Sequence, residues 1–233
     1  MNSAVTSLIT PYEAQRAFYI DFEGFQNKPP SFIGWVWAIG RRASDDNLAC
    51  IHDIHEVTLR PLVGEAIPDF PSIHDYKQRN YSLRQSINDL ARRAVKQDRR
   101  IVSWSTHELT KIAESELPDE LLRGFQHNYR DGKITAKAWF RQLGLDTSNQ
   151  TNRLTRYLKQ ADYVIPNTYG LGHTTKRLRS VIKGLNTRGS WSELIPSQQN
   201  SWDHLLLHNL IDCHGLRHIT KMAAAAIDTK ETD

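Results

Sequence analysis

Apolar and polar positions in the first part of the chain follow the pattern of β-strands. Residues 17–25 are mostly aromatic or β-branched and read AFYIDFEGF, which predicts a strand with two acids in its interior. A Pro-containing turn at 27–30 precedes a second predicted strand at 31–40, which is apolar enough for the middle of a sheet. An alternating third strand is expected at 51–59. The polar, Pro-containing segment 60–80 is expected to be a loop.

The pattern changes to a helical period after residue 81. Apolar residues from Leu83 to Ala94 recur near every 3.6 residues, which predicts an amphipathic helix over 82–97 with Ser82 as its N-cap. The further elements predicted are a fourth strand at 101–104 and helices at 174–184 and 202–226. Three successive strands followed by helix, strand and further helices indicate an α/β fold, a mixed β-sheet flanked by α-helices.

Composition and charge narrow the class of protein further. The 233 residues carry 30 Lys and Arg against 26 Asp and Glu, and 39% hydrophobic residues allow one large domain with a full core. No run approaches the roughly 18 apolar residues of a membrane span, and no secretory signal is visible, so we expect a cytoplasmic protein without a membrane partner. Cys50 and Cys213 are too few for a disulfide framework. A zinc site with His52 and His55 is disfavoured because these positions of a strand face opposite ways.

Two acids inside a predicted strand require a physical reason. Asp21 and Glu23 are two residues apart, so they project to the same face, about 7 Å apart along the strand. Half-buried carboxylates repel each other, and the usual remedies are protonation, an arginine partner or a cation. A divalent metal is the functional interpretation, and a strand end at which both acids reach water is the alternative.

A second set of candidate residues lies near the end of the chain. The helix predicted at 202–226 places His208 and Asp212 four residues apart and therefore on one face. Apolar residues around them can hold this helix against a sheet. An aspartate among such apolar residues indicates a functional role. The alternative is a carboxylate on the helix surface that pairs with Arg217 or a histidine.

Taken in order, these segments resemble the DEDD exonuclease superfamily, which has a ribonuclease H-like fold. The sequence YIDFEG at 19–24, followed by the apolar second strand, resembles the first motif of the superfamily. The sequence VSWSTHE at 102–108 is similar to the second acidic motif, and YGLGHTTKRL at 169–178 to the helix start before the last motif. The sequence NLIDC at 209–213 resembles the last motif of the YprB-like or RecB-like nuclease branch.

The resemblance implies a single ribonuclease H-like, DEDD-type nuclease domain over residues 14–226, with flexible termini at 1–13 and 227–233. It implies a divalent-metal-dependent nuclease that hydrolyses phosphodiester bonds, acting as a 3′–5′ exonuclease on single-stranded DNA or RNA ends. Since a fold does not establish an activity, the alternative is a nucleic-acid-binding or assembly module with an impaired active site.

The resemblance also implies the roles of individual residues. The metal ligands for two Mg²⁺ or Mn²⁺ ions would be Asp21, Glu23, Glu108 and Asp212, because such ions prefer oxygen ligands. Asp131 and Asp162 are alternatives for the third of these acids. His208 would accept or position a proton, since imidazole titrates near neutral pH.

Positive charge is concentrated ahead of the last acidic motif. Between 151 and 190 the chain has eight Lys or Arg residues and one Asp, which is typical of a track for a phosphate backbone. The residues expected to bind nucleic acid are Arg153, Arg156, Lys176, Arg177, Arg179 and Lys183, and those that could stack bases are Tyr157, Tyr163, Tyr169 and Trp191. The alternative is a solvated helix face with the aromatic residues in the core.

Overall fold

The computed structural model of the protein describes residues 7–25, 28–39, 48–55, 73–115, 117–148, 153–166, 169 and 173–231. Its strands are β1 (Phe18–Gly24), β2 (Pro30–Ala38), β3 (Leu48–Ile54), β4 (Ile73–Arg79), β5 (Ile101–Ser103) and β6 (Tyr129–Asp131). Its helices are α1 (Pro11–Arg16), α2 (Leu83–Lys96), α3 (His107–Ala113), α4 (Asp119–Asn128), α5 (Gly132–Gln142), α6 (Leu154–Gln160), α7 (Thr174–Arg188) and α8 (Pro196–Glu231), with a short 3₁₀ turn at Trp191–Glu193.

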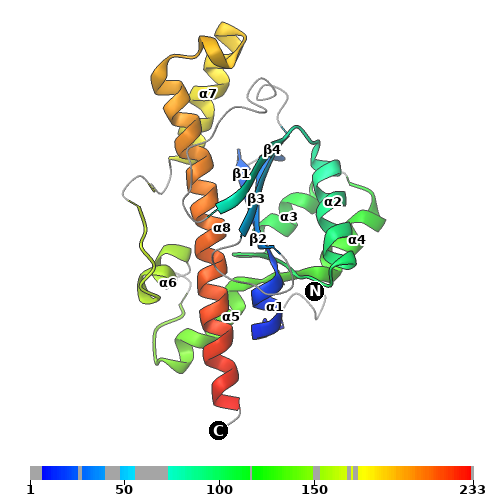
Figure 1. The fold of residues 1–233 in the computed structure, drawn as a ribbon, viewed down its shortest axis with the longest axis vertical. Coiled ribbons are helices and arrows are strands. Elements are labelled where there is room, and N and C mark those ends of the chain that lie inside the picture. Colours follow the sequence, from blue (N-terminus) through cyan, green and yellow to red (C-terminus); the bar gives the residue numbers. More distant parts are fainter. Residues whose placement is uncertain are drawn as a thin grey trace.

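The six strands form one mixed sheet in the order β4-β3-β2-β1-β5-β6. Strands β1, β2 and β3 are antiparallel neighbours, β5 and β6 run parallel to β1, and β4 runs parallel to β3. Helices flank this sheet (Figure 1). The predicted α/β class is therefore confirmed, and the strand order is compatible with a ribonuclease H-like arrangement.

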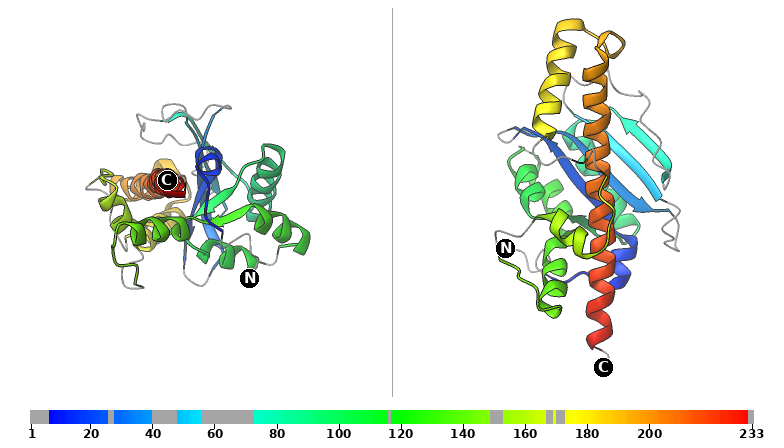
Figure 2. Two further views of the ribbon diagram at one scale, coloured as in Figure 1. Left: turned by 90° about the horizontal axis from the view of Figure 1, so that it is seen from below. Right: turned by 90° about the vertical axis from the view of Figure 1, so that its left-hand side faces the viewer.

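The side chains of β1 alternate between the two faces of the sheet. Phe18 and Ile20 belong to a core cluster with residues of α2 and α4, whereas Tyr19 belongs to a cluster with residues of α5, α6 and α8. Figure 2 shows α8 running across the second of these faces. Asp21 and Glu23 follow Tyr19 at two-residue intervals, so the alternation directs both acids toward α8.

Two strands lie where the sequence pattern predicted none. Strand β4 lies within the predicted loop 60–80, and its polar sequence reflects an edge position with β3 as its neighbour. Its Arg79 is held by two hydrogen bonds, 2.6 and 2.9 Å, to the buried Asp53. Strand β6 has only three residues, which are too few to show a period in the sequence. Strand β3 begins three residues before the predicted start, and the predicted continuation at 56–59 lies outside the described residues.

The predicted helices are present, and the last one is longer than predicted. Ser82 caps α2 through a reciprocal capping box with Gln85, as expected. Helix α8 begins at Pro196 rather than at residue 202. The sequence did not predict this earlier start because the first turns of the helix are polar and carry no apolar period. It is 36 residues long but contains polar residues throughout. Within the described part of the chain, no helix has the length and apolar character needed to cross a membrane.

Residues at both ends of the chain, in the segments predicted to be flexible termini, contact the core. Ile9 is 2% exposed and its N–H donates to the Thr135 hydroxyl over 2.9 Å, and Thr10 caps α1. At the other end α8 continues to Glu231, and Ile227 packs in the same core cluster as Ile9. These contacts are long-range, so the local polar composition did not indicate them. Residues 1–6 and 232–233 lie outside the described residues.

Candidate active site

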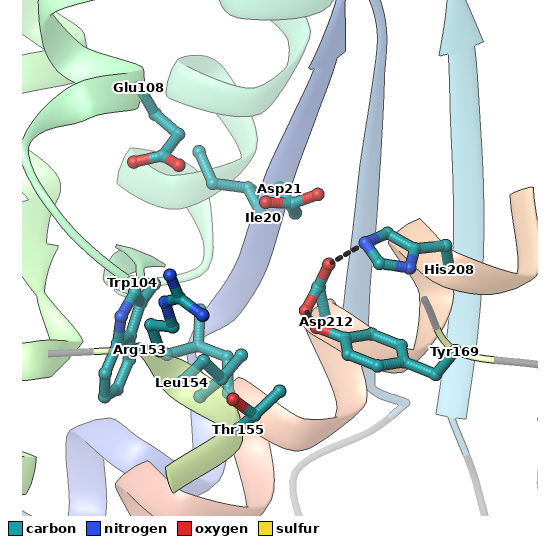
Figure 3. A pocket seen from close by; sticks show the side chains of 11 residues that line it. Ile20, Asp21, Trp104, Glu108, Arg153, Leu154, Thr155, Tyr169, His208 and Asp212 are labelled. Carbon is teal, nitrogen blue, oxygen red and sulfur yellow. Dashed lines mark hydrogen bonds and ion pairs between the residues drawn. The ribbon is translucent and has the colours of Figure 1, made fainter. Parts of the chain in front are cut away.

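Residues predicted from the two ends of the chain meet between β1 and α8. A pocket of about 350 Å³ is lined by Ile20, Asp21, Trp104, Glu108, Arg153, Leu154, Thr155, Tyr169, His208, Asp212 and Leu216 (Figure 3). Beside it, single ligand atoms of Glu23, His208 and Asp212 lie within 4.8 Å of one another. The structure therefore brings all five predicted catalytic residues into one region, although only these three form a compact metal-type cluster among the described residues.

Asn209 fixes the position of Asp21. Its side-chain N–H donates to the Asp21 carboxylate over 2.7 Å and to the Asp21 carbonyl over 3.1 Å. Its side-chain oxygen lies 3.0 Å from Nε2 of His52, so this nitrogen must carry a proton and donate it. Nδ1 of His52 then accepts from the Tyr76 hydroxyl. This chain of hydrogen bonds connects the edge of the sheet to the first acid of the site.

A glycine allows α8 to approach the sheet this closely. Gly34 on β2 pairs with Asp21 on one side and with His52 on the other. A Cβ atom at position 34 would lie 1.6 Å from Oδ1 of Asn209. The thiol of Cys213 also approaches the Gly34 carbonyl, at 3.5 Å. The missing side chain at position 34 is therefore a requirement of the Asn209 contact.

The clustered acids are electrostatically unfavourable without a counter-charge. Burial and the neighbouring carboxylates, first that of Asp212, raise the pKa of Asp21 and of Glu23 well above the usual range. Burial raises the pKa of Asp212 to about 7, although the Tyr169 hydroxyl donates to it over 2.5 Å. Arg177 and a hydrogen bond from Thr174 oppose the shift at Glu23. The clustered carboxylates therefore favour protonation or a bound cation.

His208 differs from the sequence prediction in its titration. Its Nε2 lies 3.2 Å from Oδ2 of Asp212, and its ring stacks on Tyr169 with centroids 4.3 Å apart. Burial, and the positive charge of Arg177, lower the pKa of His208 to about 4. The prediction that this imidazole titrates near neutral pH is therefore wrong, because a buried cation is poorly solvated. At pH 7 His208 is neutral, which is the form that binds metals.

Among the three candidates for the remaining acid, Glu108 is the one that lines the pocket. It is 6% exposed and accepts a hydrogen bond from the Ser103 hydroxyl over 2.9 Å, while burial raises its pKa to about 7. Asp131 instead caps α5 by accepting from the Lys133 N–H over 2.9 Å. Asp162 is exposed and does not line the pocket.

The predicted basic residues divide into separate groups. Arg153 lines the carboxylate pocket, and Arg177 lies close enough to Glu23 to affect its pKa. Arg179 and Lys183 line a different cavity, and Lys176 is exposed at the start of α7. Arg156 is 3.9 Å from Asp146 and lies over the Phe140 ring.

The aromatic residues expected to stack bases are mostly packed against protein. Tyr157 is fully buried, so its assignment as a base-stacking residue is wrong. Tyr163 and Trp191 pack against core clusters, and Tyr169 stacks on His208. The packing of Tyr157, Tyr163 and Trp191 agrees with the alternative interpretation, in which the aromatic residues belong to the core.

Sequence reasoning missed the supporting residues of the site. Asn209 lay inside the last motif, but its role depends on the contact of α8 with β1. Tyr169 is separated from Asp212 by 43 positions, and nothing local indicated their hydrogen bond. Gly34 was visible as a glycine inside an apolar strand, a pattern that signals close backbone approach.

Comparison of the chain with protein-family models, curated proteins and solved structures finds no match. The chemistry of the site therefore follows from the side-chain atoms that could bind a ligand. Carboxylate oxygens with one imidazole suit a hard or borderline divalent cation. Nδ1 of His208 is buried without a hydrogen-bond partner among the described residues. Repelling acids and an unsatisfied imidazole nitrogen both fit a bound cation.

Mn²⁺ is expected to stabilise the protein more at pH 7.5 than at pH 5. The site carboxylates have raised pKa values in the folded state, so between about pH 4 and 7 these carboxylates bind more protons in the native protein than in the unfolded chain. The stability they contribute therefore falls as pH rises through this range. Because the metal needs deprotonated ligands, its stabilisation grows over the same range.

Thermal melting with and without Mn²⁺ at both pH values measures this effect. At a free concentration of 100 times Kd, binding adds about 2.7 kcal/mol, or roughly 5–10 °C for a chain of this size. An equal gain at the two pH values, or no gain, would contradict a carboxylate metal site.

Proposed function

We propose that this protein is a divalent-metal-dependent nuclease that hydrolyses phosphodiester bonds as a 3′–5′ exonuclease on single-stranded DNA or RNA ends. The observation that carries the proposal is that five residues from distant parts of the sequence lie in or beside one pocket: Asp21, Glu23, Glu108, His208 and Asp212. A buried cluster of acids costs free energy of folding unless the charges are paired, so such a cluster indicates a functional site. The resemblance of the acidic motifs to the DEDD exonuclease superfamily supports the same activity.

The donor set divides into two parts that suit two Mg²⁺ or Mn²⁺ ions. Glu23, Asp212 and His208 would hold one ion, since their ligand atoms already lie within 4.8 Å of one another. Asp21 and Glu108, which line the same pocket, would hold the second ion. Bound in pairs, such ions activate water and stabilise the leaving oxygen of a phosphodiester.

Residues of the chain itself would position the ligands and the substrate. Asn209 holds the Asp21 carboxylate, and Tyr169 donates to Asp212, so both acids have fixed orientations. Arg153, at the start of α6, lines the pocket and can bind a phosphate oxygen through its planar guanidinium (Figure 3). Trp104 and Leu154 form apolar walls that can accept a base or sugar.

Labelled oligonucleotides provide the direct test. With Mn²⁺ or Mg²⁺, single-stranded DNA or RNA labelled at its 5′ end should shorten to a ladder of products, and EDTA should stop the reaction. A strand blocked at its 3′ end and a circular single strand are the controls, and both should persist. Cleavage of the circle would contradict the exonuclease assignment. Binding without hydrolysis in either metal would favour the nucleic-acid-binding module instead.

A further inference from the structure

A second cavity lies beyond the end of β1. It has a volume of about 500 Å³ and is lined by Phe25, Lys28, Arg179, Ile182, Lys183, Asn186 and Thr187. None of these residues lines the carboxylate pocket. The cavity therefore combines residues that follow β1 with one face of α7.

Three positive side chains in this cavity have no acidic partner in the described part of the chain. None of the ion pairs among the described residues includes Lys28, Arg179 or Lys183. Arg179 and Lys28 instead approach the Phe25 ring, with their charged groups 5.8 and 5.9 Å from its centroid. These distances are at the outer limit of cation–π contacts, about 6 Å, so a ligand could replace them at small cost. The cavity is therefore suited to an anion.

Phe25 gives the cavity an aromatic wall. The residue is partly buried and packs against the core cluster that also contains Phe32 and Leu178, so its ring has a rigid base. Cations that line a groove together with an aromatic ring are the usual means of binding a single-stranded nucleic acid, since phosphates pair with the cations and bases stack on the ring. A simple phosphate site would not need the ring.

Both walls of the cavity lead directly from the carboxylates. Phe25 follows Glu23 by two residues, which corresponds to about 7 Å of extended chain. Helix α7 begins at Thr174, whose side chain hydrogen-bonds Glu23, and Arg179 lies about 7.5 Å further along its axis. A strand bound at the carboxylates could therefore continue along β1 and α7 into the cavity.

We propose that this cavity is a subsite for the single-stranded nucleic acid next to the nucleotide at the carboxylates. Arg179 and Lys183 bind its phosphate, Lys28 adds charge, and Phe25 stacks a base. The assignment relies on the proposed nuclease function for the identity of the strand, and it applies to DNA and RNA alike because both have these groups.

Binding of a fluorescent single-stranded oligonucleotide in EDTA tests the subsite without hydrolysis. The double variant Arg179→Ala/Lys183→Ala should weaken binding at least tenfold and reduce the slope of log affinity against log salt by about 1.4 for two lost phosphate contacts. Phe25→Leu keeps an apolar side chain and should weaken binding about tenfold without changing the slope. The charge-matched control Arg84→Ala/Lys96→Ala, on exposed positions of α2, should bind as the wild type does.

The possible results separate this subsite from the nuclease proposal. If the cavity variants bind normally while the wild type still shortens oligonucleotides, the subsite is wrong and the nuclease function stands. If they lose affinity but the wild type hydrolyses nothing, the subsite stands and the nuclease function fails. If Phe25→Leu binds as the wild type does, base stacking on Phe25 is refuted. If the control variant loses as much affinity as the double variant, the location of the subsite is refuted. Thermal melting of each variant verifies that it is folded.

Discussion

Replacement of Asp21 by Asn should abolish metal-dependent hydrolysis while leaving the fold intact. The substitution removes the carboxylate whose pKa is raised by burial and by all three other acids of the site. Metal ions supply several kcal/mol of transition-state stabilisation, so we expect a loss of about a thousandfold or more in turnover. Asn has nearly the same shape as Asp, and its side-chain oxygen can still accept the hydrogen bond that Asn209 now donates.

The same variant should become more stable when no metal is present. At pH 7.5 the wild-type protein must either keep protons on its buried acids or bear their repulsion, and Asn at position 21 removes one of these charges. A raised melting temperature in EDTA together with lost hydrolysis therefore identifies a functional acid. A structural acid would behave in the opposite way, because its removal would destabilise the fold.

Asp75→Asn is the matched control for both measurements. Asp75 lies on the edge strand β4, its side chain is 43% exposed, and its ion pair with Lys77 is long at 3.9 Å. Its replacement should change neither turnover nor stability by a measurable amount. Unchanged hydrolysis in Asp21→Asn would refute the proposed mechanism, and unfolding of that variant would show that Asp21 has a structural role.

The sequence predicted the acids of the site better than their environment. Alternation along β1 correctly placed Asp21 and Glu23 on one face, and helical spacing correctly placed His208 beside Asp212, because both rules are local. Burial is not local. The low pKa of His208 results from the packing of α7 and Tyr169 around it, which no spacing in the sequence indicates.

The same distinction explains the errors in the fold. The apolar strands β1 and β2 were predicted because a buried strand must be hydrophobic. The sequence predicts a loop where strand β4 lies because an edge strand can be polar, and β4 is defined by its pairing with β3. The contact between Gly34 and Asn209 likewise depends on how β2 and α8 meet, so only the structure reveals it.

Replacement of Gly34 by Ala should strongly destabilise the protein. The new Cβ would lie 1.6 Å from Oδ1 of Asn209 and 2.9 Å from a ring carbon of His52, both of which are buried and hydrogen-bonded. Overpacking of this kind costs about 3 kcal/mol at the upper end of the usual range, or a melting temperature lower by roughly 6–12 °C. Gly124→Ala on α4 is the control, since no atom lies within 4 Å of the added Cβ and the helix should gain about 1 kcal/mol.

A double-mutant cycle tests whether the Asn209 contact causes the loss. Asn209→Ala alone should be destabilising, because the Asp21 carboxylate and Nε2 of His52 both lose the hydrogen bond that Asn209 makes with them. It also removes the atoms that the Cβ at position 34 would meet first. The two substitutions together should therefore cost at least about 1 kcal/mol less than the sum of the single changes, as residues in contact do. Additive effects in chemical denaturation would show that Gly34 and Asn209 act independently and that α8 does not approach the sheet through this pair.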